Sequence, residues 1–576
     1  MKILVFIKQI PDVNRIEFDT STMRVRREGV PLLLNSFDRK AIEEAVRIHE
    51  KSGATTVTVT MGPPSAKEIL VESLRMGIDD AILVTDRELA GADTLVTSGV
   101  LAEVARKVRP DLIMLGKYSL DGETSQVPPE VAEFLGLPFK SSVSRMEFDG
   151  NGGVVVEQEL EDGAASFVLT LPAVVSVSEK INRARVPAPA SADFEQRITV
   201  MSLRDTAAAV NGSDSPTIVT GTEKVESFRK TLFIEPDENA FRLILELASR
   251  SRVKETASIA LTDNGELTGE LWGVALDDPD TSMEIASKLA ELSIPEKMSV
   301  KVAGNILPDL LEGMLCHEYL YAECIDYELF SDALAELIIS NKPKCVVFPS
   351  TVNGREVAAK IAARLRLGLT ADCIDLKIEH GKLIQYKPAF GGGIVARIVS
   401  RTSPEMATVR PGIFPKRAGT SPMRVGAIQT HGESRVKRLS FTQRPKEYRK
   451  LSSSEVVIGI GRGIKSKENV PAILSLAEKM GASVGATRPV VDMGWVPSQQ
   501  QIGLTGISIS PSLYVALGIS GRDNHVVGIR YSGSVLAVNT DRNSPIFRYA
   551  DYGVVCDMMD FVKKLDEFIV SHAKNK

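Results

Sequence analysis

Val456-Val457-Ile458-Gly459-Ile460-Gly461-Arg462-Gly463 is the stretch that most clearly indicates the fold. An apolar run without alternation is typical of a parallel strand that is buried on both faces. Glycines after such a strand allow a tight turn into a helix, where backbone N–H groups can approach a pyrophosphate. The spacing is not the GxGxxG of the conventional dinucleotide fingerprint, and a turn of this kind also occurs without a ligand. The stretch therefore predicts an α/β unit that begins near Glu455.

Two more series of strands and helices precede this unit. Residues 3–7, 55–61, 81–84 and 112–115 have strand patterns, and a helix with Asp38 as its N-cap and Gly53 as its stop lies between the first two. A second series starts near Glu270. It repeats the order of strand, loop, helix and glycine, with a strand at 346–348, a helix at 356–365 and Gly368. We predict an α/β protein with three parallel-sheet (Rossmann-like) domains, two forming a pseudo-dimeric base: residues 1–255, 256–450 and 451–576.

The connecting segments have simpler interpretations. A helix around 238–250 is expected to close the first half, and residues 435–450, rich in Arg and Lys, are expected to be a solvated linker rather than a nucleic-acid patch. The final helix carries an apolar stripe that includes Met558, Phe561 and Leu565, so it should pack against another domain.

Composition mainly excludes functions. The chain has 576 residues, 25% of them charged, and a net charge of −5, which is too mild to indicate nucleic-acid binding. It contains no apolar run long enough for a transmembrane helix, and its first apolar run is too short for a signal peptide. Five scattered cysteines without a CxxC pair favour reduced thiols and a cytoplasmic location. Cys316, His317 and Cys324 are interpreted as ordinary buried residues rather than metal ligands.

Several motifs follow the opening stretch in order. They are Gly485-Ala486-Thr487-Arg488-Pro489, Gln501-Ile502-Gly503-Leu504-Thr505-Gly506, residues 513–525, Val538-Asn539-Thr540-Asp541 and residues 550–557. With these motifs, the chain from about Leu271 to its end resembles the α-subunit of electron-transfer flavoproteins. The resemblance implies an FAD in the C-terminal domain, bound by Arg462, Thr487, Arg488, Gln501, Ile502, Gly503, Leu504, Thr505, Ser520, Gly521, Arg522, Asp523, Asn524, His525, Asn539 and Asp557.

The resemblance also assigns individual roles. Arg488 would lie over the isoalloxazine, Thr505 near N5 and His525 near O2. A fixed cation about 4 Å from a developing negative charge contributes about 4 kcal/mol at an effective dielectric near 20. Arg488 alone would then suffice to set the flavin potential. Leu504 and Asn524 depart from the usual Gln at each position, which would alter hydrogen bonding without preventing binding.

The first 250 residues resemble the β-subunit of the same family. The matching motifs include Lys8-Gln9-Ile10-Pro11-Asp12, Gly91-Ala92-Asp93-Thr94 and residues 121–127, although Pro128 stands where Gly is usual. The resemblance implies a second adenine nucleotide, FAD in preference to AMP, held by Lys8, Asn35, Asp38, Asp93, Thr94, Asp121, Gly122, Glu123, Thr124, Gln126 and Val127. The arm at 185–192 takes the place of the partner-docking loop but lacks its anchoring Leu.

A fusion of both subunits implies an electron carrier. Its donors would be an acyl-CoA dehydrogenase-like or other flavin dehydrogenase, as in fatty-acid β-oxidation, or NADH. Its acceptors would be a quinone-linked oxidoreductase or, in an electron-bifurcating protein, ferredoxin as well. The alternative is a sensor that binds AMP or ATP without redox function, which the presence of Arg488, Thr505 and His525 disfavours. We also expect the C-terminal domain to rotate on linkers near residues 435–451 and the final helix.

Overall fold

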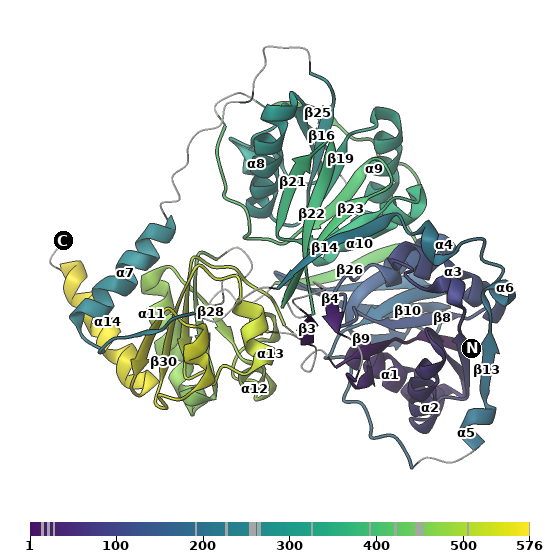
Figure 1. Cartoon of the computed structure of the whole chain (residues 1–576), viewed down its shortest axis with the longest axis horizontal. Coiled ribbons are helices and arrows are strands. Elements are labelled where there is room, and N and C mark those ends of the chain that lie inside the picture. The colour runs from purple at the N-terminus through teal and green to yellow at the C-terminus, as the bar shows by residue number, and fades with distance from the viewer. Residues whose placement is uncertain are drawn as a thin grey trace.

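The computed structural model contains three α/β units, coloured from purple to yellow along the chain (Figure 1). It describes every residue except 13–16, 20–23, 27–28, 190–192, 225–228, 253–260, 262–266, 324–325, 391–392, 420–422, 444–447, 449–450, 452–453, 504–505 and 575–576. Leu504, Thr505 and Cys324, which the sequence singled out, therefore lie outside the described residues.

The first unit is built on a ten-stranded sheet. Its parallel strands are, in spatial order, β13 (Ile198–Met201), β7 (Asp80–Val84), β6 (Thr55–Met61), β1 (Lys2–Phe6), β8 (Leu112–Gly116), β12 (Ala173–Val177) and β9 (Phe139–Phe148). Antiparallel β10 (Gly153–Leu160), β11 (Gly163–Thr170) and β26 (Val436–Gln443) extend it. Helices α1 (Ser36–Ser52) and α2 (Lys67–Arg75) pack on one face, and α3 (Thr94–Val108) and α4 (Val127–Leu135) on the other.

The second unit has a seven-stranded parallel sheet. Its spatial order is β20 (Leu369–Cys373), β24 (Glu405–Val409), β19 (Cys345–Pro349), β16 (Glu270–Ala275), β17 (Ser299–Gly304), β18 (Glu318–Tyr321) and β25 (Arg424–Ala427). Helix α8 (Pro279–Glu296) covers one face, while α9 (Tyr327–Asn341) and α10 (Val352–Leu365) cover the other. An adjoining antiparallel sheet has the order β14 (Thr217–Lys224), β23 (Ile394–Ser400), β22 (Lys382–Ala389) and β21 (Asp375–Glu379).

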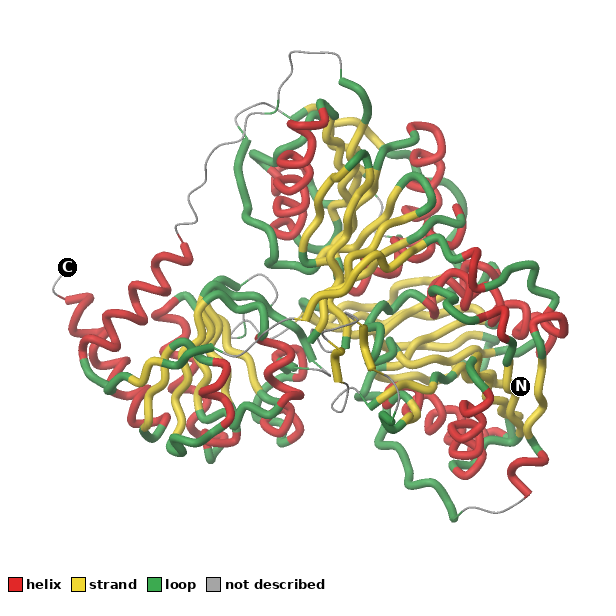
Figure 2. The backbone as a smooth tube through the Cα atoms, in the orientation of Figure 1, coloured by secondary structure: helices red, strands yellow, loops and turns green. Residues whose placement is uncertain are grey.

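The first two units match strand for strand. The order β13-β7-β6-β1-β8-β12-β9 of the first sheet corresponds to β25-β18-β17-β16-β19-β24-β20 of the second. Each unit also gives one strand to the other, since β14 pairs with β23 and β26 pairs with β11. Figure 2 shows the strands of both units meeting at the centre of the molecule. The predicted pseudo-dimeric base is confirmed.

The third unit is a six-stranded sheet in which all strands are parallel. Its order is β15 (Leu232–Phe233), β31 (Tyr552–Val555), β30 (Ser534–Asn539), β29 (Leu513–Leu517), β27 (Val456–Ile460) and β28 (Ser483–Ala486). Helices α11 (Val470–Met480), α14 (Met558–Lys574) and α7 (Glu238–Arg252) share its larger apolar core.

Three expectations about connections are wrong. Helix α7 does not close the first unit, because Phe241, Ile244 and Ala248 pack into the core of the third unit, where α7 lies beside α14 (Figure 1). Helix α14 packs on its own sheet and on α7, not against another domain. The segment 435–450 is not simply a linker, since it contains β26.

The first helix also begins earlier than its sequence suggests. Asn35 is the N-cap of α1, and Asp38 lies buried in the first turn. Its carboxylate accepts hydrogen bonds from the backbone N–H groups of Lys8, at 2.8 Å, and Gly116, at 3.1 Å. Asp38 thus joins α1 to the ends of β1 and β8 instead of capping the helix.

Candidate nucleotide-binding sites

The carboxyl edge of the third sheet gathers the residues assigned to FAD. Arg462 follows β27, Thr487 and Arg488 follow β28, and Ser520 and Arg522 follow β29. Asn539 ends β30, and Asp557 follows β31. The chain runs from β27 outward to β28 and then returns to β29 on the other side of β27. Open α/β sheets bind ligands outside the carboxyl ends of their strands at such a switch point, so this edge has the topology of a dinucleotide site.

These residues differ in exposure, with Thr487, Asn539 and Asp557 half-buried. Arg462, Arg488, Ser520, Arg522 and Asn524 are exposed, which leaves charged and polar groups free to meet phosphates or a ring. The buried residues of the set lie beneath them: Gln501, Ile502, Gly503, Gly521 and His525. Of Asp523, only the backbone placement in α13 (Asp523–Val526) is described.

The glycines of the turn after β27 pack closely against the end of β29. The N–H of Gly461 donates to Leu517 O at 2.9 Å, and the N–H of Gly463 donates to Gly518 O at 3.1 Å. A Cβ at Gly461 would overlap the Gly518 carbonyl, so these glycines are required for close packing of two strand ends. The turn continues into 3₁₀ segments, and α11 starts only at Val470. The N–H groups of Gly461 and Gly463 therefore bond within the protein, and a phosphate at this turn would need other donors, such as Arg462.

His525 is held from both sides of its ring. Its Nε2 lies 2.9 Å from the Tyr514 hydroxyl and its Nδ1 lies 3.2 Å from Ile502 O. Burial lowers the pKa of His525 to about 4, so the ring is neutral at pH 7. The tautomer that satisfies both contacts has its proton on Nδ1. Any contact of this ring with a flavin would have to exchange one of these two partners.

Arg488 is the charged group at the same edge. Its side chain is 57% exposed, and its Nε lies 3.3 Å from Asp492 Oδ2. Solvent screening at that exposure reduces the field that Arg488 can exert on a ring well below the value expected for a buried cation. The residue faces the first unit: burial lowers the pKa of Lys40 on α1, and the charge of Arg488 lowers it further.

A cavity of about 1010 Å³ lies at the corresponding edge of the first sheet. Nine of the eleven residues predicted for the second nucleotide line it: Lys8, Asn35, Asp38, Asp93, Thr94, Gly122, Thr124, Gln126 and Val127. Of the other two, Asp121 forms an ion pair with Lys8 at 2.8 Å, and Glu123 lines a smaller neighbouring cavity. The structure therefore brings this predicted set together.

Several of these residues shape the cavity by fixing the loop 117–126. Asn35 donates from Nδ2 to Tyr118 O at 3.0 Å, and Lys8 binds Asp121. Gln126 accepts from the Thr94 hydroxyl at 2.8 Å. Glu123 and Ser125 hold positive φ angles of 50° and 57°, a conformation that costs free energy in non-glycine residues and often occurs at functional sites.

The smaller cavity, of about 190 Å³, lies where the three units meet. Glu123 of the first unit, Asp372 of the second and Ser508 of the third all line it. Although burial opposes it, the charges of Arg410 and Arg355 hold the pKa of Asp372 well below its usual range. This cavity shares Tyr118 and Ser125 with the larger one, so it lies between that pocket and the third unit.

Sequence reasoning missed the wall that the second unit adds to the larger cavity. Leu369, Thr370, Ala371, Lys387 and Ile398 all line it. In this neighbourhood, sequence patterns singled out only Gly368, which directly precedes Leu369 and was assigned no role at a ligand.

A nucleotide-sized cavity at the carboxyl edge of the first sheet and a switch-point edge in the third are typical of nucleotide-binding α/β proteins. Family comparison identifies the class. The family model described as "Electron transfer flavoprotein domain" matches residues 22–206 and 321–436, and that of the "Electron transfer flavoprotein FAD-binding domain" matches residues 450–530. The chain belongs to the electron-transfer flavoprotein family, and its C-terminal unit is the FAD-binding domain.

Relatives correspond to both subunits. The electron transfer flavoprotein subunit alpha of Thermoanaerobacterium thermosaccharolyticum is 39% identical over 42% of this chain and 76% of its own length. Subunit beta of the same organism is 41% identical over 32% of this chain and 72% of its own length. The lactate dehydrogenase (NAD(+),ferredoxin) subunit LctC of Acetobacterium woodii is 36% identical over 43% of this chain and 61% of its own length. Among the helices described, none combines the length and apolarity needed to cross a bilayer.

Proposed function

We propose that this chain is a single-chain electron carrier, with FAD in its third unit and a second FAD in the cavity of the first. The observation that carries the proposal is the switch-point edge of the FAD-binding domain, where exposed Arg462, Arg488 and Arg522 meet at strand ends. Arg462 and residues 520–522 would hold phosphates, and Arg488 would lie at the ring. Bound FAD would supply one- and two-electron redox chemistry.

Cavity size favours FAD over AMP in the first unit. Pockets for drug-sized ligands span roughly 300–1,000 Å³, and this cavity reaches about 1010 Å³. AMP is less than half the size of FAD and would leave much of that space to water. The larger cavity also adjoins the smaller one, which borders the FAD domain, because Tyr118 and Ser125 line both.

Partners follow from the family. We propose a flavin dehydrogenase, such as an acyl-CoA dehydrogenase, as donor and a quinone-linked oxidoreductase as acceptor. The relative LctC carries NAD(+) and ferredoxin in its name, which supports NADH and ferredoxin as the partners if both nucleotides are FAD. We also propose a cytoplasmic location.

The three-domain division is also a proposal, with boundaries near 255 and 450 except that residues 229–252 pack with the third unit. The chain leaves the base after β14 and after β26 and returns to it before β16, so rotation of the FAD domain would use the connections that join these strands to the third unit. Because α14 belongs to the core of the FAD domain, it is not one of the hinges. Interflavin distances that are identical with and without a partner protein would contradict the rotation.

Nucleotide release from the purified chain, with quantification of FAD and AMP, tests the proposal. We expect two FAD per chain and loss of flavin absorbance on addition of NADH. One FAD with one AMP would contradict the second flavin and leave a simple carrier. A colourless protein that cannot be reconstituted with FAD would contradict redox function altogether.

A further inference from the structure

The third unit contacts the base at residues 410–412, which follow β24 in the second unit. The guanidinium of Arg410 lies over the ring of Tyr531, with its Cζ 5.5 Å from the ring centroid. The hydroxyl of Ser510 donates to Gly412 O at 3.2 Å. Two side chains of the third unit therefore meet a single short segment of the base.

The base holds this segment in place. The Arg410 N–H donates to Cys373 O at 3.0 Å, and the Gly412 N–H donates to Glu284 Oε2 on α8 at 2.8 Å. The Arg410 guanidinium also binds Asp372, with its Nε 3.1 Å from Oδ2, and the two side chains are only 7% and 9% exposed. The face of the guanidinium is thus fixed before an aromatic ring reaches it, and a planar guanidinium stacks well on such a ring.

The two contacting segments of the third unit are joined to each other. The Ile509 N–H donates to Gly528 O at 2.8 Å, and the Gly533 N–H donates to Pro511 O at 2.8 Å. These bonds connect the segment that carries the hydroxyl to the segment that carries the aromatic ring. Both side chains can therefore approach the base as one surface.

This surface adjoins the FAD-binding edge. Its two segments follow residues 501–505 and 520–525, which were assigned to FAD. Residues 506–508 and Val527 come next along the chain, and they line the smaller cavity together with Glu123 of the first unit. The contact therefore keeps the FAD-binding domain beside the first unit as well as the second.

The contact is weak enough to open. A cation–π contact changes an equilibrium by about two- to thirtyfold, and a hydrogen bond between uncharged groups by about two- to tenfold. Arg410 keeps Asp372 as its counter-ion when the ring departs, so opening leaves no buried charge of this pair uncompensated. Small interfaces between domains permit relative motion.

We propose that Tyr531 and Ser510 form a latch, which holds the FAD-binding domain on the base through Arg410 and Gly412. The inference rests on the proposed rotation of that domain, because the latch must open before the domain can turn away. The latch then sets the fraction of molecules in which the FAD-binding edge lies beside the first unit.

Distances between two spin labels measure that fraction in the full chain with its flavin bound. Labels on non-natural amino acids at the exposed positions Ser340 of α9 and Ser475 of α11 avoid the native cysteines. In Tyr531→Leu the ratio of latched to released molecules should fall about two- to thirtyfold. Ser510→Ala should lower it about two- to tenfold, and Tyr531→Phe, which keeps an aromatic face, should retain most of it.

Tyr552→Leu is the matched control, because this ring packs against the larger apolar core of the third unit. It should leave the ratio unchanged, while flavin absorbance checks in each variant that the FAD-binding domain is folded. If Tyr531→Leu lost its flavin, Tyr531→Phe and Ser510→Ala would decide the outcome. A ratio that ignored Tyr531→Leu and Ser510→Ala alike would overturn the latch and leave the rotation standing. A single distance in the wild-type chain and in every variant would overturn both.

Discussion

The two halves of the base have the same strand order, yet the large cavity lies in the first. The difference begins after the fourth strand of each sheet. In the first half, β8 ends at Gly116 and α4 starts at Val127, so residues 117–126 form an open loop above the sheet edge. In the second half, β19 ends at Pro349 and α10 starts at Val352. Only two residues therefore separate strand from helix there, and no loop comparable to 117–126 stands above that edge.

Polar groups of the second half also close its own edge. Asp277, just after β16, accepts hydrogen bonds from Tyr327 at 2.9 Å, Thr351 at 2.6 Å and Asn353 at 2.7 Å. One topology can therefore hold a ligand or close over its own side chains, depending on where one helix begins. In the second half, α10 instead contacts the first half.

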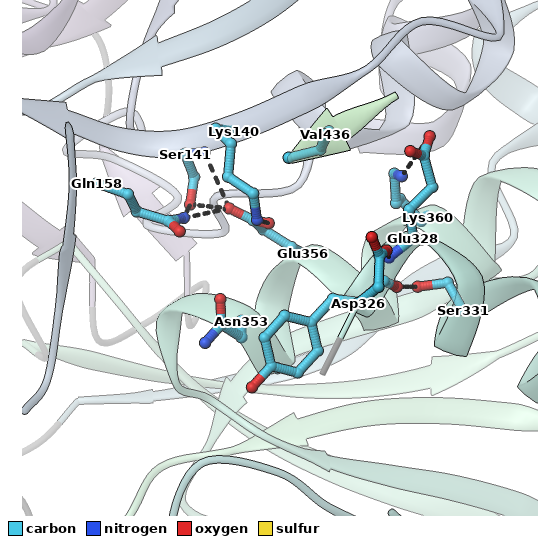
Figure 3. Close-up of polar contacts among 12 residues, drawn as sticks. Lys140, Ser141, Gln158, Asp326, Glu328, Ser331, Asn353, Glu356, Lys360 and Val436 are labelled. Carbon is cyan, nitrogen blue, oxygen red and sulfur yellow. Dashed lines mark hydrogen bonds and ion pairs between the residues drawn. The ribbon is translucent and has the colours of Figure 1, made fainter. Parts of the chain in front are cut away.

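Glu356 on α10 makes that contact, as Figure 3 shows. Its carboxylate binds Lys140 Nζ at 2.9 Å, the Ser141 N–H at 2.9 Å and Gln158 Nε2 at 2.6 Å. Both Lys140 and Glu356 have side chains only 6% exposed. All of these partners belong to β9 and β10 of the first unit, so the early start of α10 places a buried ion pair between the halves.

The largest predicted effect comes from Glu356→Ala. It leaves Lys140 buried without its counter-ion, which costs about 3–5 kcal/mol. Urea denaturation in a Trp495→Phe background, where Trp272 of the second unit reports alone, measures the loss. Glu147→Ala, which breaks an exposed pair with Arg145, should cost less than about 1 kcal/mol. Equal losses in both variants would contradict the role of the buried pair.

The first half keeps its own buried carboxylate on α4, and this group forms no ion pair with any residue that the structure describes. Glu130 accepts from Ser98 at 2.7 Å and Thr94 at 3.2 Å, and burial raises its pKa to about 8. A raised acid pKa means that the folded state holds a proton that the unfolded state has lost. Stability should therefore fall as pH rises from about 4.5 to 8, by a few kcal/mol at most, since one pKa unit is worth about 1.4 kcal/mol.

Glu130→Gln tests whether Glu130 causes this pH dependence, because the amide cannot titrate. Its unfolding free energy, measured from pH 5 to 8, should decline less than that of the wild-type chain; the decline that remains includes that of Asp38, whose pKa burial raises to about 7. A wild-type chain whose stability rises through this range, with no change of slope in Glu130→Gln, would show that Glu130 is ionised when folded.

Local pattern predicted most of the elements, and long-range pairing explains what it missed. Strands such as β1 and β27 are buried along their length, so their apolar runs identified them. Strand β26 is exposed after Val436, has no apolar alternation and pairs with a strand far away in sequence. The stripe of α7 showed that one face is buried, but not which sheet covers it.

The candidate nucleotide sites were likewise only partly predictable from local sequence patterns. The residues of the cavity lie near strand ends, where motif order could find them, whereas Thr370 and Lys387 reach it only through contact between halves. Likewise, no spacing in the sequence shows that Tyr514 and Ile502 occupy both nitrogens of His525.

A smaller effect is expected at Gly116, whose counterpart at the end of β19 is Pro349. A Cβ at Gly116 would approach Phe37 Cβ to 2.6 Å and press on Asp38, which holds Lys8 beside the cavity. Overpacking of this kind costs about 1–3 kcal/mol, so Gly116→Ala should reduce the second-nucleotide content per chain. Gly99→Ala on α3, where a Cβ has room, should not. Full nucleotide content in Gly116→Ala would show that the first half does not need glycine there.

The smallest effect tests the exchange of strands. Val436 of β26 is 8% exposed and belongs to the core of the first unit, although its strand comes from the second half. Burial of a methyl-sized group contributes about 0.8 kcal/mol, so Val436→Ala should cost roughly 1.5 kcal/mol in thermal or urea unfolding. Leu439, on the same strand, is 52% exposed, and Leu439→Ala should fall within about 0.5 kcal/mol of wild type. If both changes were neutral, β26 would lie on the first sheet without supporting it. The side chains of β26 would then add no stability to the join between the halves, which would depend on β14 and on contacts such as those of α10.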